Sequence, residues 1–242
     1  MIPPPQRAMV LAAGKGVRMR PITERTPKPL VKVGERALLD YALASLIAAS
    51  VREAVVNAHY FAEAIDAFVA AYQRAHPSLT LHLSHEDELL ETGGGVVRAR
   101  SRLGDAPFYV LNADVIVRDG ATPALHRLAQ AFDPARMDTL LLLQPVARAI
   151  GYDGKGDYRL SPDGRLESRG GAANAPFVFT GAQILTPSLL DGAPDGPFSL
   201  KLLYDRSEAE RRLFGLVHDG AWLHVGTPDA LRLAEQAIAA AS

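Results

Sequence analysis

Positive charge is concentrated in one short segment near the N-terminus. The chain has a formal net charge of -1, yet positions 15–32 contain a single acidic residue, Glu24, and six basic ones: Lys15, Arg18, Arg20, Arg25, Lys28 and Lys32. Gly14 and Gly16 allow the backbone there to turn so that its N–H groups converge, and such a turn combined with Arg and Lys side chains binds anions. The segment is therefore predicted to bind phosphate groups.

The glycine-rich run differs from two common phosphate-binding sequences. It does not end in Gly-Lys-Ser/Thr, as a P-loop would, and Met19 occupies the third glycine position of the dinucleotide-binding fingerprint. On composition alone, a solvated basic loop after a strand explains the segment equally well, because glycine-rich turns after strands are common.

The elements that would position this segment alternate between strand and helix. Apolar runs predict strands, and apolar residues spaced three and four apart predict helices. Strands are expected at residues 8–13, 53–58, 79–84, 108–112 and 138–143, and helices at 37–50, 61–74, 94–103 and 123–132. This alternation predicts an α/β fold with a Rossmann-like, mostly parallel sheet and helices on both faces.

Beyond about residue 151 the sequence predicts a smaller, β-rich part. Pro162-Asp163-Gly164 predicts a hairpin between strands 158–160 and 165–167, and Asp219-Gly220 predicts a second hairpin within 213–225. The remaining expected elements are a strand at 177–185 and a helix from Pro228 to Ala241 with Thr227 as its N-cap. We expect a single domain over residues 1–242, with a core at 1–150, a smaller part at 151–242 and no β-helix tail.

Composition excludes several classes of protein. The 242 residues include no cysteine, which excludes disulfides, thiolate nucleophiles and cysteine-bound metal clusters. The near-neutral charge gives no general attraction to nucleic acid or to an anionic membrane. The longest early apolar run, Met9 to Ala13, is too short for a signal segment or a membrane-spanning helix. We therefore expect a cytoplasmic protein with no nucleic-acid or membrane partner.

Ordered motifs along the chain resemble the signature of the sugar nucleotidyltransferases. The matching runs are Leu11-Ala12-Ala13-Gly14, Gly16-x-Arg18, Pro27-Lys28-Pro29, Glu91-Thr92-Gly93-Gly94-Gly95, Asn112-Ala113-Asp114 and Val225-Gly226-Thr227-Pro228. The resemblance implies that a sugar 1-phosphate oxygen attacks the α-phosphorus of a nucleoside triphosphate and releases pyrophosphate. The compact length and Gly156-Asp157-Tyr158 are most similar to family members that use UTP and N-acetylmuramate 1-phosphate in cell-wall recycling.

The resemblance assigns the nucleotide to the first half of the chain. Arg18 matches the family's loop arginine and is expected to clamp the triphosphate. Lys28 is expected to lie between the two phosphates, with its flanking prolines fixing the local backbone. The expected nucleotide contacts are two short segments: Ala12, Ala13, Gly14 and Gly16, and Thr92, Gly93 and Gly94. A flexible turn before a helix is the alternative for the second segment.

Asp114 follows an apolar strand, where ligands of open α/β sheets bind. The resemblance implies that Asp114 holds Mg²⁺, the expected cofactor, and a loop-capping aspartate is the alternative. The family often supplies a second carboxylate in Trp-x-Asp-x-Gly-Thr, and His224 stands at that position here. Imidazole is a weaker Mg²⁺ ligand than oxygen. Either His224 therefore contacts a metal-bound water or a phosphate, or Asp114 carries the metal with substrate oxygens and waters.

Residues of the second half match positions at which family members contact the hexose. The expected sugar contacts there are Gly156, Asp157, Thr180 and Gly181, with a surface loop as the alternative for Gly156-Asp157 and a buried strand as the alternative for Thr180. Asn112, from the first half, is expected to hydrogen-bond the sugar or the ribose. A lactyl carboxylate would need a cation, for which Lys155, Arg159 and Lys201 are candidates.

Two other functions stay open at this point. One is a guanylyltransferase acting on mannose or heptose 1-phosphate, and the other is a non-catalytic nucleotide-sugar sensor, which the histidine at position 224 would favour. The oligomeric state is unknown from the sequence.

Overall fold

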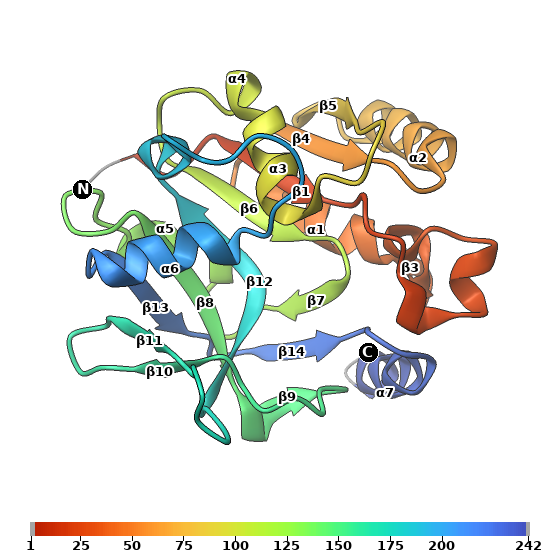
Figure 1. Ribbon diagram of the computed structural model, residues 1–242. Coiled ribbons are helices and arrows are strands. Elements are labelled where there is room, and N and C mark those ends of the chain that lie inside the picture. The colour runs from red at the N-terminus through yellow and green to blue at the C-terminus, as the bar shows by residue number, and fades with distance from the viewer. Residues whose placement is uncertain (1–2, 241–242) are drawn as a thin grey trace.

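A computed structural model describes residues 3–240, and its centre is a nine-stranded sheet (Figure 1). The main order is β11-β10-β12-β6-β1-β4-β5, with β8 paired to β12 and β13 paired to β8. The strands are β1 (Arg7–Leu11), β4 (Glu53–Ala58), β5 (Thr80–His85), β6 (Phe108–Asn112), β8 (Thr139–Pro145), β10 (Tyr158–Leu160), β11 (Leu166–Ser168), β12 (Phe177–Leu185) and β13 (Leu213–Val217).

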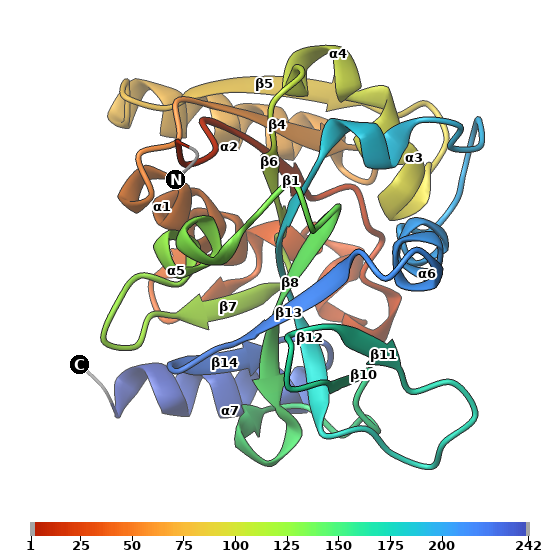
Figure 2. The same cartoon turned by 90° about the vertical axis from the view of Figure 1, so that its left-hand side faces the viewer.

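Helices cover both faces of this sheet (Figure 2). One face carries α1 (Leu38–Ala48), α2 (Ala62–Ala75) and α5 (Ala124–Ala131), and the other carries α3 (Glu91–Arg98), α4 (Arg100–Leu103) and α6 (Lys201–Ala209). Successive side chains of a strand point to opposite faces, so Ala8 and Val10 of β1 pack with the first set of helices and Met9 packs with the second. A strand buried on both faces explains the continuous apolar run in the sequence.

The sheet is mostly parallel, with β12 reversed at its centre and β11 reversed at its edge. β6, β1, β4 and β5 are parallel neighbours, whereas β12 is antiparallel to both β6 and β8. β12 pairs with β6 through Ala182–Leu185 and with β10 through Phe177, and its register against β8 shifts between Phe179 and Gln183. One end of β12 therefore pairs with β6 and the other end pairs with β10. The two neighbouring strands separate beside Asn112, at the end of β6.

A second, three-stranded sheet lies beside the carboxyl end of β6. It consists of β7 (Val115–Arg118), β14 (Ala221–His224) and β9 (Ala149–Ile150), and α7 (Pro228–Ala239) packs against it. Ile116, Leu223 and Ala234 share one buried cluster with Met19, which explains why a large apolar residue follows the glycine-rich run. The two-stranded ribbon β2 (Lys32–Val33) and β3 (Arg36–Ala37) completes the strands of the described residues.

The remaining ordered segments are single 3₁₀ turns. They comprise Val17–Met19, Ile22–Glu24, Lys28–Leu30, Val146–Arg148 and Pro187–Leu190. The first three lie in the basic segment, and they contain two of its six cations, Arg18 and Lys28.

The hairpin predicted at Asp219-Gly220 is wrong. β13 pairs in parallel with β8, and β14 pairs with β7 and β9 in the other sheet, so the two strands do not pair with each other. The side chains of the two strands are buried in different hydrophobic clusters. Phe214 belongs to the cluster on the α1, α2 and α5 face of the large sheet, whereas Trp222 packs with Val115 and Val178. The hairpin between β10 and β11 is confirmed, with Leu160 opposite Leu166.

Two helix predictions also need correction. The segment 94–103 forms two helices, and α3 begins at Glu91, three residues before the expected start. The three glycines therefore lie inside the helix rather than in a turn before it. Helix α7 has the predicted cap, since Thr227 Oγ1 accepts the N–H of Ala230, but it ends at Ala239. The predicted end at Ala241 lies outside the described residues.

Candidate functional site

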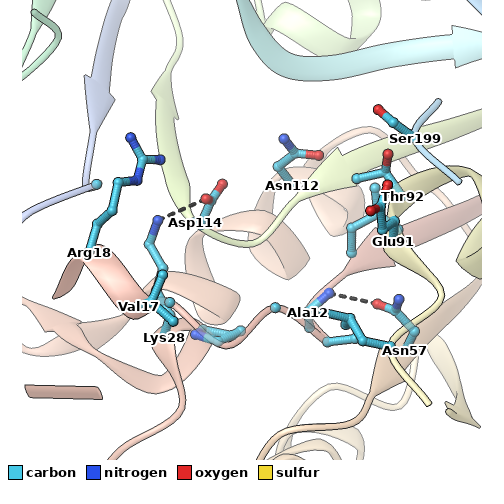
Figure 3. Close-up of a pocket in the computed structure, with 17 residues that line it drawn as sticks. Ala12, Val17, Arg18, Lys28, Asn57, Glu91, Thr92, Asn112, Asp114 and Ser199 are labelled. Atoms are coloured by element: carbon cyan, nitrogen blue, oxygen red, sulfur yellow. Dashed lines mark hydrogen bonds and ion pairs between the residues drawn. The ribbon is translucent and has the colours of Figure 1, made fainter. Parts of the chain in front are cut away.

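A cavity of about 440 Å³ lies at the carboxyl ends of β1 and β6. Figure 3 shows Arg18, Lys28 and Asp114 grouped in one part of it, with Ala12, Asn57, Glu91 and Thr92 in another and Asn112 between. This is the edge at which ligands of open α/β sheets bind. Of the predicted nucleotide residues, the cavity is lined by Ala12, Ala13, Gly14, Gly16 and Thr92.

The basic segment folds around Gly16. This residue has φ of 61°, and a Cβ there would lie 2.9 Å from Cβ of Lys28 and 3.0 Å from Cγ2 of Thr23. The carbonyl of Gly16 accepts the hydroxyl of Thr23 at 2.8 Å and the N–H of Met19 at 2.9 Å. A glycine at this position therefore brings the turn that carries Lys28 directly against the loop that carries Arg18.

Lys28 and Asp114 form an ion pair within the cavity. Nζ of Lys28 donates to Oδ2 of Asp114 at 2.8 Å, and Lys28 is only 6% exposed. Partial burial favours the neutral acid, but the charge and hydrogen bond of Lys28, helped by His224 and Arg18, hold the pKa of Asp114 below its ordinary value. The carboxylate is therefore ionised at neutral pH, and both groups are oriented before a ligand arrives.

His224 lies next to this ion pair. It is opposite Val115 in the β7–β14 register, and Gly226, on which its imidazole packs, lines the cavity. Burial lowers the pKa of His224, so the ring is neutral at pH 7. Because its Nδ1 lies 3.1 Å from the carbonyl oxygen of Gly151, Nδ1 carries the proton and Nε2 keeps its lone pair. Trp222 stacks on the ring with centroids 5.7 Å apart.

Asn57 and Glu86 form a buried support for the cavity that the sequence reasoning missed. Oδ1 of Asn57 accepts the N–H of Ala12 at 2.6 Å, and its Nδ2 donates to Oε1 of Glu86 at 2.7 Å. Oε2 of Glu86 accepts the N–H of Leu90 at 3.0 Å. In the sequence, Asn57 could have been noticed as a polar residue near the apolar end of the strand that became β4, which pairs with β1. This chain of bonds fixes the loop after β1 relative to the start of α3.

The glycines of α3 serve helix packing. A Cβ on Gly93 would overlap the ring of Phe198, one on Gly94 would overlap the carbonyl of Gly196, and one on Gly95 would lie 2.9 Å from both Asn57 and Glu86. Gly93 and Gly94 do not line the cavity of about 440 Å³, whereas Thr92 does. The helix thus needs glycines for close approach to its neighbours, and the residues that precede them face the cavity.

A second cavity, of about 390 Å³, adjoins the first. The two share Leu11, Thr92, Asn112 and Ser199 in their lining. Asp157, a predicted sugar contact, lines the second cavity, and its Oδ2 accepts the N–H of Phe179 at 2.9 Å. Other lining residues were not predicted from the sequence: Tyr158, Ser168, Arg169, Gly170, Phe179 and Tyr204.

The other predicted sugar contacts of the second half, Thr180, Gly181 and Gly156, each take part in local packing. Thr180 is fully buried, and its hydroxyl donates to the carbonyl of Leu142 at 2.9 Å, so its side chain does not face either cavity. Gly181 has φ of 89° and leaves room for the side chain of Asn112, since a Cβ there would lie 2.9 Å from Cβ of Asn112. Gly156 has φ of 75° and packs tightly against the carbonyl of Ala175.

The described residues hold no group of three or more metal-ligating side chains. Of the two residues predicted to hold the metal, Asp114 lines the larger cavity and has oxygen donors, whereas His224 lies beside the lining. Glu91, a second acidic residue, also lines this cavity. Over the same part of the chain, no helix is long and apolar enough to cross a membrane.

Residues 7–152 match the family described as nucleotidyl transferase, and the chain belongs to that family. Over 238 residues it is 42% identical to the N-acetylmuramate alpha-1-phosphate uridylyltransferase of Caulobacter vibrioides, with 98% of each chain covered. The protein of the same name from Neisseria meningitidis serogroup B is 32% identical, over 97% of this chain and 99% of the other. The family that the motifs predicted is confirmed.

Solved structures confirm the fold as well. The chain superimposes on a UDP-glucose pyrophosphorylase in complex with UDP-glucose with a TM-score of 0.80 at 15% identity, covering 98% of this chain and 99% of the other. The corresponding apo structure gives a TM-score of 0.78 at 16% identity, with 98% of each chain covered. At these identities the likeness concerns the fold alone.

Proposed function

We propose that this chain is a cytoplasmic, Mg²⁺-dependent uridylyltransferase that joins UTP to N-acetylmuramate 1-phosphate and releases pyrophosphate, in the recycling of cell-wall sugars. The observation that carries the proposal is the pair of adjoining cavities, of about 440 Å³ and 390 Å³, with Asn112 in the lining of both. A reaction between a nucleotide and a sugar phosphate needs two such compartments. The names of the relatives that are 42% and 32% identical support the choice of UTP and N-acetylmuramate.

The chemistry is a displacement at phosphorus. An oxygen of the sugar 1-phosphate forms a bond to the α-phosphorus of UTP, the bond from that phosphorus to the bridging oxygen breaks, and pyrophosphate leaves with the electron pair. The nucleophile is already an anion, so no general base is needed. The barrier consists mainly of bringing two polyanions together in line and of stabilising the charge on the phosphoryl oxygens.

Arg18 and Lys28 supply that charge stabilisation. Arg18 is an exposed cation on the cavity wall, where its guanidinium can clamp a triphosphate bidentately. Lys28 is buried, and its hydrogen bond to Asp114 holds its ammonium in place before substrate binds. Less side-chain entropy is therefore lost when the phosphates bind than for a mobile surface lysine.

The donor set near Lys28 fits Mg²⁺. This ion is usually held by one or two carboxylates together with substrate phosphates and waters, so a single ionised Asp114 is sufficient on the protein side. His224, with a neutral ring and a free Nε2 lone pair, suits an outer contact in which it accepts a hydrogen bond from a metal-bound water. The metal would neutralise phosphate charge next to the α-phosphorus.

The base is proposed to bind between the loop after β1 and the start of α3. Ala13 and Gly14 present backbone groups to the cavity beside Ala12, whose N–H is bonded to Asn57. Because Asn57 and Glu86 hold this loop by hydrogen bonds, its backbone donors and acceptors are fixed in position and can pair with the edge of a pyrimidine base. Glu91 and Thr92 form the opposite wall.

Pyrophosphate release by the purified protein tests this proposal. UTP, GTP, CTP, ATP and dTTP are each paired with the 1-phosphates of N-acetylmuramate, N-acetylglucosamine, glucose, mannose and heptose, with and without Mg²⁺. The proposal predicts the fastest release with UTP and N-acetylmuramate 1-phosphate, and none with EDTA. Preferred release with GTP and mannose or heptose 1-phosphate would overturn the substrate assignment. Nucleotide binding without turnover for any pair would overturn the enzyme assignment.

A further inference from the structure

The second cavity contains two cations, and they differ in how they are held. Lys201, at the start of α6, is paired with Asp205 one turn later, with its Nζ 2.5 and 2.8 Å from the two carboxylate oxygens. Its side chain is 62% exposed. A cation that is already neutralised at the surface contributes little to the binding of a further anion.

Arg169, directly after β11, is held by backbone groups alone. Its Nε donates to the carbonyl of Gly156 at 3.0 Å and its Nη1 donates to the carbonyl of Ala172 at 3.0 Å. Its own N–H donates to the carbonyl of Asp157 at 2.6 Å. Within residues 3–240, Arg169 forms no ion pair, and its Nη2 has no hydrogen-bond acceptor. The guanidinium is thus oriented and half-buried but keeps its full charge and one free amino group.

The carbonyl that orients Arg169 is itself fixed. The N–H of Gly156 donates to the hydroxyl of Tyr152 at 3.1 Å, and the carbonyl of Lys155 accepts the N–H of Ala175 at 2.7 Å. The left-handed conformation of Gly156 lets Ala175 approach where a side chain would collide. The glycine that the family resemblance placed at the sugar therefore acts by positioning the guanidinium.

We propose that Arg169 binds an anionic substituent of the sugar ring, and that it selects sugar 1-phosphates carrying a carboxylate over their uncharged counterparts. This inference rests on the proposed function of the second cavity. Asp157, the acidic side chain in the lining of this cavity, has one oxygen occupied by the N–H of Phe179 and suits a sugar hydroxyl. Arg169 thus supplies the unpaired positive charge that a carboxylate needs there. Of the three cations suggested by the sequence, Lys155 and Arg159 do not line the cavity.

The experiment compares two sugars that share a ring but differ in the lactyl group: N-acetylmuramate 1-phosphate and N-acetylglucosamine 1-phosphate. The variants are Arg169→Met and Lys201→Met, and Arg159→Met is the matched control because Arg159 is an exposed arginine outside the cavity. kcat and KM are measured for each sugar with UTP, and binding of each sugar 1-phosphate is measured by calorimetry. Thermal unfolding checks that every variant is folded.

A hydrogen bond to a charged group corresponds to about 10- to 100-fold in affinity. Arg169→Met is therefore expected to lower the preference for the carboxylated sugar by about 10- to 100-fold, mainly through KM, while Arg159→Met leaves the preference unchanged. An equal loss for both sugars would show that Arg169 only supports the surrounding loops, and loss of the preference in Lys201→Met alone would assign the role to Lys201. Either result overturns the inference.

Different results of this experiment would contradict the proposed function and the proposed role of Arg169. Absence of turnover by the wild-type protein with either sugar would contradict the uridylyltransferase assignment. In that case the calorimetry decides the role of Arg169: tighter wild-type binding of the carboxylated sugar that is lost in Arg169→Met supports it, and equal binding of both sugars overturns it.

Discussion

Lys28 and Asp114 are 86 residues apart in the chain and 2.8 Å apart in the structure. Both were predicted as site residues, but with separate partners: phosphates for the lysine and a metal ion for the aspartate. Their contact follows from the turn at Lys28–Leu30 lying beside the end of β6, which motif spacing does not show. In the absence of ligand the two side chains form an ion pair, so the almost fully buried lysine has a carboxylate partner.

Replacing Asp114 by asparagine keeps the shape of the side chain and removes its charge. We expect Asp114→Asn to lower Mg²⁺-dependent turnover by about 100-fold or more, because a carboxylate that would hold the metal beside the α-phosphate is lost. Asp229→Asn, at an exposed position of α7, is the control. Steady-state rates across a Mg²⁺ titration measure the effect. Near-normal rates in Asp114→Asn would remove this residue from the site.

We expect the buried residue His218 to make the free energy of unfolding depend on pH. It is fully buried after β13, and its Nε2 lies 2.9 Å from the carbonyl oxygen of Arg118. Its Nδ1 has no hydrogen-bond partner among the described residues and lies 3.9 Å from Oδ1 of Asp219. Burial lowers its pKa below the ordinary 6.5. The unfolded chain therefore takes up a proton at a higher pH than the folded protein does, and stability is lost as pH falls below about 6.5.

The expected loss is about 1.4 kcal/mol per pH unit, between the ordinary pKa and the lower folded pKa of this residue. Urea unfolding of wild-type protein and His218→Gln from pH 7.5 to pH 5 measures it. The variant should show the smaller dependence on pH over this range. Equal pH dependence in the two proteins would show that His218 does not contribute.

At the scale of elements, the sequence predicted the strands and helices of the core well. β1 and β6 are uninterrupted apolar strands because both faces of the sheet are covered, and this pattern is visible without a structure. The hairpin at Asp219-Gly220 was mispredicted because turn residues do not show which sheet the next strand joins. The start of α3 was missed because glycine normally disfavours helix, whereas here tertiary contacts with Phe198 and Gly196 require it.

The packing of α3 yields a prediction about nucleotide binding. A methyl group at position 95 would lie 2.9 Å from Nδ2 of Asn57 and from Oε1 of Glu86, so Gly95→Ala must displace the bonds that hold the N–H of Ala12. We expect KM for UTP to rise about 10-fold and the free energy of unfolding to fall by about 1–3 kcal/mol. Gly171→Ala, with open space around its Cβ, is the matched control. An unchanged KM in Gly95→Ala would show that this support does not shape the nucleotide site.

At the scale of the whole molecule, the reversed strand β12 divides the site into two compartments. β12 leaves β6 near Gly181 and pairs with β10 at Phe177, and the two cavities meet beside Asn112 where the strands separate. The division into a core at 1–150 and a part at 151–242 stays a prediction, since β12 and β13 of the second part belong to the same sheet as β1 and β6. This division could not show that Thr92 also lines the second cavity, because long-range packing of α3 against α6 brings it there.

A crystal structure with UDP-N-acetylmuramate would show whether the nucleotide and the sugar occupy these two compartments. We expect the uracil between Ala13 and Thr92, the diphosphate beside Arg18 and Lys28, and the sugar against Asp157 with its carboxylate at Arg169. A sugar outside the second cavity, or a uracil away from the loop after β1, would contradict this expectation.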